Sequence, residues 1–230
     1  MISAPRPHRP RFVLVGGATG VGKSTVAEGL ARRLEVVRVI STDIIREVLR
    51  SALELEGRPE LGVSTFEAGK LDGLEQGEEQ TDRELEAKSD VPGVDPVVAG
   101  FNQQVRAVAG GIRALMRRAL VEGTDIIVEG VHLVPGAIDL PDEREAITVR
   151  IVVAVEDVDA HQSYLVARSH GTPSRPPQRY LKRFDEIRRI QAEVIRRAEE
   201  QGVPMVYATT PEATVEAAFA IVEKAFAHRT

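Results

Sequence analysis

Short apolar runs rich in β-branched residues recur along the chain, separated by stretches with apolar residues three or four positions apart. The runs that predict strands are residues 12–15, 36–40, 126–128, 148–155 and 205–208. Helical spacing is found at 25–34, at 44–53 and, most clearly, in Val105, Val108, Ile112, Leu115, Met116 and Ala119. Strands that alternate with helices are joined by right-handed crossovers, which give a parallel sheet covered on both faces. The pattern therefore predicts an α/β fold with a parallel sheet of about five strands.

Two segments depart from this alternation. Residues 54–90 hold twelve acidic and four basic side chains, which is typical of a solvated face or a mobile insertion. The stretch from about 166 to 190 is instead rich in arginine and interrupted by proline and glycine. A basic helix is usually only a solvated surface, but clustered arginines beside such breaks also suit a lid over phosphates. We expect a single domain, residues 1–230, with an acidic insertion at about 54–96 and a basic helical lid.

Composition narrows the classes of function. The chain has 230 residues, 43% of them hydrophobic, which is enough to bury the core of one domain. Its net charge of -5 argues against a general nucleic-acid surface, and the absence of cysteine excludes a disulfide framework. The start MISAPRPHRP is unlike a secretory signal, and no run reaches the ~18 apolar residues of a membrane span. We expect a cytoplasmic protein without nucleic-acid or membrane partners; the sequence predicts no oligomeric state.

The segment GGATGVGKST, residues 16–25, matches the phosphate-binding pattern G-x-x-x-x-G-K-[ST], with a predicted strand before it and a predicted helix after it. Its glycines allow the backbone to curve round an anion, so that amide groups point at phosphate oxygens. Lys23 would reach the β- and γ-phosphates of ATP, and Ser24 would hold Mg²⁺. The residues expected to bind ATP here are Gly17, Ala18, Thr19, Gly20, Val21, Gly22, Lys23, Ser24 and Thr25.

Other nucleotide-binding classes fit the chain less well. The base-reading motifs of guanine-nucleotide switches, Asn-Lys-x-Asp and Thr-Lys-x-Asp, do not occur in it. Residues 90–93 spell D-x-x-G, but they follow an acidic segment rather than an apolar strand, so we attribute the match to chance. A mechanical ATPase would need further domains or partner surfaces. The P-loop NTPase-type pattern therefore favours a kinase.

Asp43 lies just after the second predicted strand, where ligands bind in open parallel sheets. Aspartate is also a preferred N-cap, and a capping carboxylate can face a substrate hydroxyl as well. The helix that follows is expected to bury one face and to leave Arg46 and Arg50 off it. The residues expected on the buried face are Ile44, Ile45, Val48, Leu49 and Ala52.

In IIVEGVHLVPG, residues 126–136, Glu129 ends an apolar strand and His132 follows it before a Pro-Gly break. A carboxylate buried without a partner is costly. We therefore expect Glu129 to orient a Mg²⁺-bound water or a nucleophilic hydroxyl. His132 is either a second functional group or a histidine hydrogen-bonded within a loop.

The sequence resembles the P-loop small-molecule kinases typified by 2-phosphoglycerate kinase. The resemblance rests on GGATGVGKST, ISTDIIREVLR, GFNQQVRAVAGGIRALMRRALVEGTDIIVEGVHLVPG and RYLKRFDEIRRIQ, and covers most of residues 11–195. It implies that ATP and Mg²⁺ serve to phosphorylate 2-phosphoglycerate, a small phosphorylated acid, to 2,3-bisphosphoglycerate. Archaeal members carry an additional N-terminal module, and we expect it to be absent here because about ten residues precede the first strand.

Similarity to the wider nucleoside-monophosphate-kinase-like group implies roles for the basic segment. Arg168 looks like the arginine that stacks on adenine, and Thr210 lies in a turn similar to the one whose backbone meets the adenine edge. Arg175 and Arg179 look like lid arginines that close on the transferring phosphoryl group. Cations behind them that would bind the acceptor are Lys182 and Arg183.

The resemblance also implies an acceptor pocket, whose further residues would be Asp43, Arg46, Gln103, Gln104, Glu129 and His132. The residues expected to take part in catalysis are Lys23, Asp43, Glu129, Arg175 and Arg179. Three alternatives stay open: a kinase of another small anionic metabolite, a nucleotide-sugar kinase of the zeta-toxin kind, and a non-catalytic ATP-dependent binding protein.

Overall fold

A computed structural model of the protein describes residues 9–52, 58–73, 95–169 and 177–228. One five-stranded sheet runs through these residues, in the order β2-β3-β1-β4-β5, and every neighbouring pair of strands is parallel. The strands are β1 (Arg11–Gly16), β2 (Arg38–Ser41), β3 (Ile126–Glu129), β4 (Ile147–Ala154) and β5 (Met205–Tyr207). The predicted P-loop NTPase-type α/β fold is confirmed.

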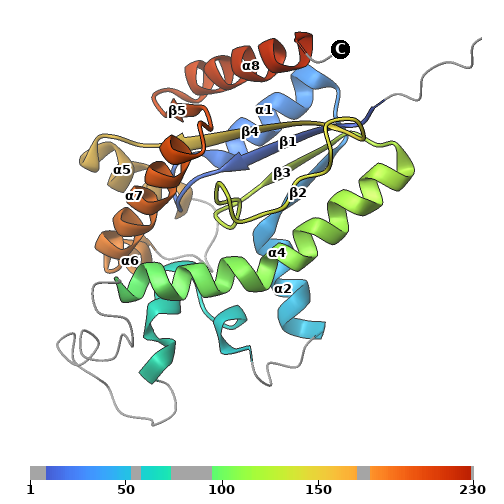
Figure 1. The fold of residues 1–230 in the computed structure, drawn as a ribbon. Coiled ribbons are helices and arrows are strands. Elements are labelled where there is room, and N and C mark those ends of the chain that lie inside the picture. Colours follow the sequence, from blue (N-terminus) through green and yellow to red (C-terminus); the bar gives the residue numbers. More distant parts are fainter. Residues whose placement is uncertain (1–8, 53–57, 74–94, 170–176, 229–230) are drawn as a thin grey trace, which may run out of the picture.

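Helices cover both faces of the sheet (Figure 1). They are α1 (Lys23–Leu34), α2 (Thr42–Ala52), α4 (Pro96–Glu122), α5 (Val158–Ser169), α6 (Pro177–Leu181), α7 (Phe184–Glu200) and α8 (Pro211–Ala227). Two 3-10 segments, η1 (Pro59–Leu61) and η2 (Thr65–Gly73), lie between α2 and α4. Helices α1 and α8 pack together on one side of the sheet, and α4 packs with α7 on the other. None of the described helices is long and apolar enough to cross a bilayer.

The alternation of side chains along β1 explains the two cores. Phe12 and Leu14 belong to a cluster with Ile112 of α4, whereas Val13 and Val15 belong to a second cluster that includes α1. All four of these β1 side chains are buried. Because both faces of the strand are covered, it reads in sequence as a continuous apolar run.

Strand β2 begins two residues later than predicted. Helix α1 ends at Glu35, which has a left-handed backbone (φ 57°), and the amide of Val36 still bonds to the carbonyl of Ala31 in the helix. Val36 therefore completes the helix end, and Val37 is 95% exposed. The apolar run at 36–40 was a strand signal only in its second half.

Helix α2 buries only part of the face that its sequence predicted. Ile44 and Val48 are exposed, whereas Ile45 and Leu49 pack against α4 at Gly111. A Cβ at Gly111 would lie 2.5 Å from Ile45 Cγ2, so the glycine permits this close approach. The prediction was wrong for Ile44 and Val48 because the surface against which α2 packs is set by Gly111, more than sixty positions away.

The acidic segment contains a packed part. Leu61, Phe66 and Ala68 are buried, and η2 runs so close to α4 that a Cβ at Gly100 would lie 2.3 Å from the carbonyl oxygen of Ala68. For residues 59–69 the prediction of a solvated or mobile run is therefore wrong. Their apolar side chains are spaced among the acids and pack beneath the first turns of α4, which begins at Pro96 after an Asp95 cap (Figure 1).

Candidate functional site

The loop between β1 and α1 forms a tight cradle. Gly17 has φ 140°, and a Cβ there would lie 2.2 Å from the carbonyl oxygen of Val153, so only glycine fits. Gly22 is left-handed (φ 87°) and caps α1. Lys23 is only 8% exposed, and its Nζ donates to the carbonyl of Ala18 at 2.7 Å. The loop thus gathers a cation and a helix N-terminus at one point, which is a binding arrangement for phosphate.

A histidine that the sequence analysis did not single out supports this loop. His161 of α5 is fully buried, and its Nε2 donates to the carbonyl of Thr19 at 2.8 Å. Burial lowers its pKa, so the ring is neutral, and within the described residues its Nδ1 has no hydrogen-bond partner. The signal that points to it is topological: α5 follows β4, the neighbour of β1, and therefore starts beside the loop.

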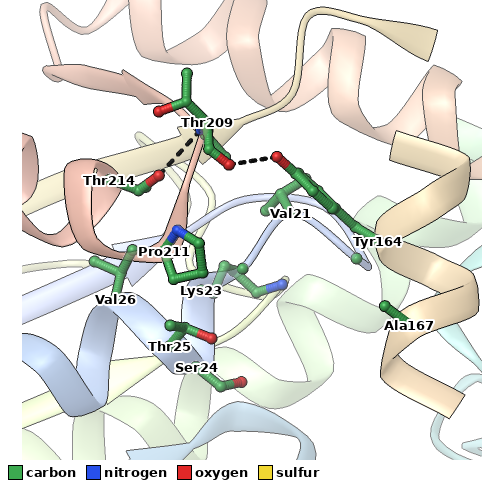
Figure 2. A pocket seen from close by; sticks show the side chains of 13 residues that line it. Val21, Lys23, Ser24, Thr25, Val26, Tyr164, Ala167, Thr209, Pro211 and Thr214 are labelled. Carbon is green, nitrogen blue, oxygen red and sulfur yellow. Dashed lines mark hydrogen bonds between the residues drawn. The ribbon is translucent and has the colours of Figure 1, made fainter. Parts of the chain in front are cut away.

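A pocket of about 310 Å³ opens between the loop, helix α5 and the turn from β5 to α8 (Figure 2). Tyr164 and Ala167 line it from α5, and Thr209 and Pro211 line it from the turn. The phenol of Tyr164 donates to the carbonyl of Thr209 at 2.5 Å. The size of the pocket and its lining of apolar and polar groups suit a nucleotide.

Two residues, Thr210 and Arg168, were predicted to contact the adenine base. Thr210 does not line this pocket; its hydroxyl accepts from the amide of Ala213 at 3.2 Å and so caps α8. The neighbouring residues Thr209 and Pro211 line the pocket. Arg168 belongs to α5, but its side chain lies outside the described residues.

Both predicted carboxylates lie at the carboxyl edge of the sheet. Glu129 is 8% exposed and stands level with Val15 of β1 and Ser41 of β2. The amide of Gly130 donates to the carbonyl of Val15 at 3.0 Å, so the chain passes beside the phosphate loop. Asp43 is exposed in the first turn of α2. Within the described ranges no three His, Cys, Asp or Glu residues are grouped so that they could hold a metal ion.

His132 lies in a buried chain of hydrogen bonds. The ring is 0% exposed; its Nδ1 is 2.9 Å from the hydroxyl of Thr42, and its Nε2 is 3.0 Å from Oε1 of Gln104. The Gln104 amide nitrogen donates to the carbonyls of Glu60 and Val63. Its oxygen therefore accepts from His132 Nε2, and the hydroxyl of Thr42 donates to Nδ1.

These hydrogen bonds contradict two of the predicted acceptor contacts. His132 and Gln104 are completely buried and spend their polar atoms on protein partners, so neither side chain meets an acceptor as predicted. Burial lowers the pKa of His132 to about 4, which keeps the ring neutral at physiological pH. Gln103, the other predicted amide, is exposed.

Arg46 also faces inward, contrary to the expectation that it would lie off the packed face of α2. Its Nη1 donates to the carbonyls of Leu61 and Val63, at 3.0 and 3.1 Å. Arg46 and Gln104 therefore share the carbonyl of Val63 and hold the η1 segment against α2 and α4. Arg50, at the end of α2, pairs with Glu47 on the surface.

In the predicted lid, Arg179 of α6 reaches the η2 segment. It donates to Ser64 Oγ and to the carboxylate of Glu67, both at 2.7 Å, and lies over the ring of Phe66. Partial burial raises the pKa of Glu67, but the Arg179 guanidinium outweighs it, and the pKa ends below its ordinary value. Helix α6, part of the predicted lid, is thus tied to Ser64 and Glu67, which follow the residues that Arg46 and Gln104 brace.

The other lid cations are less constrained. Arg183 pairs with Glu186 at 2.9 Å, one turn along α7, and Lys182 is exposed. Arg175 lies outside the described residues. The structure thus brings Lys23, Ser24, Asp43 and Glu129 to one edge of the sheet, with the nucleotide pocket on one side of it.

Known proteins similar to this chain point to the same family. The sequence profile of the family described as Zeta toxin matches residues 2–68. A 2-phosphoglycerate kinase from Methanopyrus kandleri is 40% identical over 86% of this chain and 56% of its own length. The corresponding protein of Pyrococcus horikoshii is 40% identical over 90% of this chain and 62% of its own length. The 2-phosphoglycerate kinase of Thermococcus kodakarensis is 37% identical over 92% of this chain and 66% of its own length.

The chain thus spans between 56% and 66% of the length of these relatives. The matched regions make up between 86% and 92% of the present chain. The predicted resemblance to the 2-phosphoglycerate kinase family of P-loop small-molecule kinases is therefore confirmed over most of this chain.

Proposed function

We propose that this chain transfers the γ-phosphoryl group of ATP to the free hydroxyl of 2-phosphoglycerate, giving 2,3-bisphosphoglycerate and ADP. The observation that carries the proposal is the 40% identity, over 86% of the chain, to a protein named 2-phosphoglycerate kinase. In the reaction the acceptor oxygen bonds to the γ-phosphorus while the bond from phosphorus to the β,γ-bridging oxygen breaks. The hydroxyl proton leaves the acceptor.

The phosphate loop would bind the donor. Transfer of this kind depends on positioning and charge stabilisation more than on covalent chemistry. Lys23, held at the loop by its bond to Ala18, lies where a triphosphate oxygen would take over that bond. The hydroxyl of Ser24, exposed at the start of α1, would bind Mg²⁺, which would neutralise negative charge on the phosphates.

The two carboxylates at the sheet edge would act on the acceptor. Asp43 is exposed and free to accept the proton of the attacking hydroxyl. Glu129 is nearly buried beside the phosphate loop, where it would orient Mg²⁺-bound water or the acceptor. Glu129 ends β3, the neighbour of β1, and Asp43 follows β2, the next strand out, so donor and acceptor would meet at the same edge.

The acceptor brings about three negative charges and ATP about four, so the closed site must gather cations. We assign Arg179 and Arg175 to the transferring phosphoryl group, and Lys182 and Arg183 to the acceptor. Arg46 would add positive charge to the acceptor wall while its Nη1 braces residues 61–63. His132 and Gln104 would act on the acceptor only indirectly, by holding that wall in place.

The direct test is a transfer assay with the purified chain, MgATP and 2-phosphoglycerate, followed by ³¹P NMR. The expected product shows a second phosphate ester, formed one for one with ADP. 3-Phosphoglycerate is the matched control, because its phosphate occupies the oxygen that should attack. Equal transfer to both isomers, or to glycerol, would contradict an acceptor site for 2-phosphoglycerate.

A second candidate is a nucleotide-sugar kinase, which the Zeta toxin profile match at residues 2–68 favours. That match covers the phosphate loop and α2 but not α4, β3 or the lid. A nucleotide sugar in the same assay separates the two kinases, since the better acceptor identifies the reaction. ATP binding without turnover of any acceptor would indicate a non-catalytic binding protein instead.

A further inference from the structure

The turn that closes the nucleotide pocket has its backbone groups bonded to side chains (Figure 2). The carbonyl of Thr209 accepts from the phenol of Tyr164 at 2.5 Å. The amide of Thr209 donates to the hydroxyl of Thr214 at 3.1 Å, and that hydroxyl donates to the carbonyl of Thr210 at 2.7 Å. A nucleobase that enters the pocket therefore meets the phenol of Tyr164 in front of the Thr209 carbonyl.

The carbonyl of Thr209 and the phenol of Tyr164 differ in which purine base they favour. A bare carbonyl only accepts hydrogen bonds, so it suits the amino group at position 6 of adenine and opposes the oxygen at position 6 of guanine. A phenol hydroxyl both donates and accepts, and its hydrogen rotates to suit the partner. The phenol therefore removes the preference for adenine that the carbonyl of Thr209 would impose.

The rest of the pocket is equally tolerant of the base. Tyr164 also presents an aromatic ring, and Val21, Ala167 and Pro211 add apolar surface. Stacking and apolar contact do not distinguish one purine from another, since every base has a π-face. Discrimination at this end of the pocket then rests on the polar atoms of Tyr164 and the turn.

We propose that Tyr164 is a specificity-determining residue that makes the donor site permissive, so that it accepts GTP as well as ATP. The proposal rests on the proposed function only in that this pocket holds a nucleoside triphosphate. With adenine, the phenol keeps its bond to Thr209 and accepts from the 6-amino group. With guanine, the phenol donates to the 6-oxygen, and the carbonyl of Thr209 accepts a hydrogen bond from N1–H of the base.

Tyr164→Phe isolates this effect, because the ring stays and only the hydroxyl is lost. The Thr209 carbonyl then faces the base as an acceptor alone. We expect the wild-type chain to bind ATP and GTP within about tenfold of one another, and the ratio of their affinities to shift towards ATP by about tenfold or more in the variant. Tyr207→Phe, on β5 and outside the pocket lining, is the matched control and should leave the ratio unchanged.

The measurement is isothermal titration calorimetry of the wild type and both variants with ADP and GDP and with non-hydrolysable ATP and GTP analogues. No acceptor is needed, so the result stands whether or not 2-phosphoglycerate is the substrate. A wild-type preference for the adenine nucleotide of 100-fold or more would overturn the proposal without any variant. An unchanged ratio in a folded Tyr164→Phe protein would overturn it as well.

Discussion

The imidazole of His132 donates a hydrogen bond from Nε2 to the side-chain oxygen of Gln104, 3.0 Å away and 28 positions earlier in the chain. Thr42 completes the arrangement on the other ring nitrogen. The three side chains are fully buried and join the start of α2, the first third of α4 and the loop after β3. Asp43 follows Thr42 directly, so the network fixes the backbone that carries one proposed catalytic carboxylate.

The depressed pKa of His132 predicts a loss of stability in mild acid. Its folded-state pKa of about 4 lies below the ordinary 6.5, so between these values the unfolded chain binds a proton that the folded chain does not. The contribution is complete above pH 6.5 and is lost as the pH falls towards 4. From ~1.4 kcal/mol per pKa unit, we expect a cost of about 2 kcal/mol between pH 7.5 and pH 5.

Urea unfolding at the two pH values measures this cost, and His132→Gln is the comparison. Glutamine is polar but does not titrate, so the variant should be less stable at pH 7.5 and should lose less on acidification than the wild type. His161 is buried with a lowered pKa and contributes in the same direction in both proteins. Equal acid sensitivity of the two proteins would show that His132 is not the titrating group.

The phosphate loop predicts the largest catalytic effect. In Lys23→Met the apolar stem stays in its buried position, while the ammonium that would meet the β- and γ-phosphates is lost. We expect kcat to fall by at least about 100-fold with the fold intact, because the developing charge loses its positioned cation. Steady-state kinetics together with a circular dichroism spectrum test this, and a folded variant with near-normal turnover would remove Lys23 from the mechanism.

Because Arg179 forms an ion pair with Glu67, we expect substitutions of the two residues to affect kcat differently. Arg179→Ala should lower kcat with little change in ATP affinity, because the proposed contact forms only with the transferring phosphoryl group. Glu67→Gln should maintain or raise kcat, because it releases Arg179 from the carboxylate that competes with phosphate. Arg196→Ala, which breaks two ion pairs on α7, is the control. Loss of activity in Glu67→Gln as deep as in Arg179→Ala would assign both residues to scaffolding.

Stability should change little in these lid variants. The Arg179 side chain is 48% exposed, and ion pairs of that kind contribute about 0–1 kcal/mol. A much larger loss on denaturation would mean that the pair holds α6 in the fold.

The sequence predicted the sheet and the phosphate loop because both depend on local patterns. Apolar runs and helical spacing are read within ten or twenty residues, and the glycines of the loop meet a backbone requirement that they carry themselves. The burial of His132 was not predictable in this way. Its partners lie 90 and 28 positions away, and their arrangement follows from how α2 and α4 pack. The same holds for α2, whose buried face was decided by the gap at Gly111.

The two carboxylates give the sharpest remaining test of the proposed chemistry. Glu129→Gln and Asp43→Asn keep the size of each side chain and remove its charge, so packing at the nearly buried Glu129 is preserved. If Asp43 accepts the acceptor's proton, its variant should lose about 100-fold or more in kcat while the affinity for ATP stays close to normal. If Glu129 orients Mg²⁺-bound water, its variant should lose kcat and also require more Mg²⁺ for half-maximal rate. Titrating Mg²⁺ at fixed ATP separates the two roles, with Ser24→Ala as the reference for impaired metal binding. Full kcat in both variants would leave Asp43 as a residue of the first turn of α2 and Glu129 as a strand end, and the acceptor would then need another base.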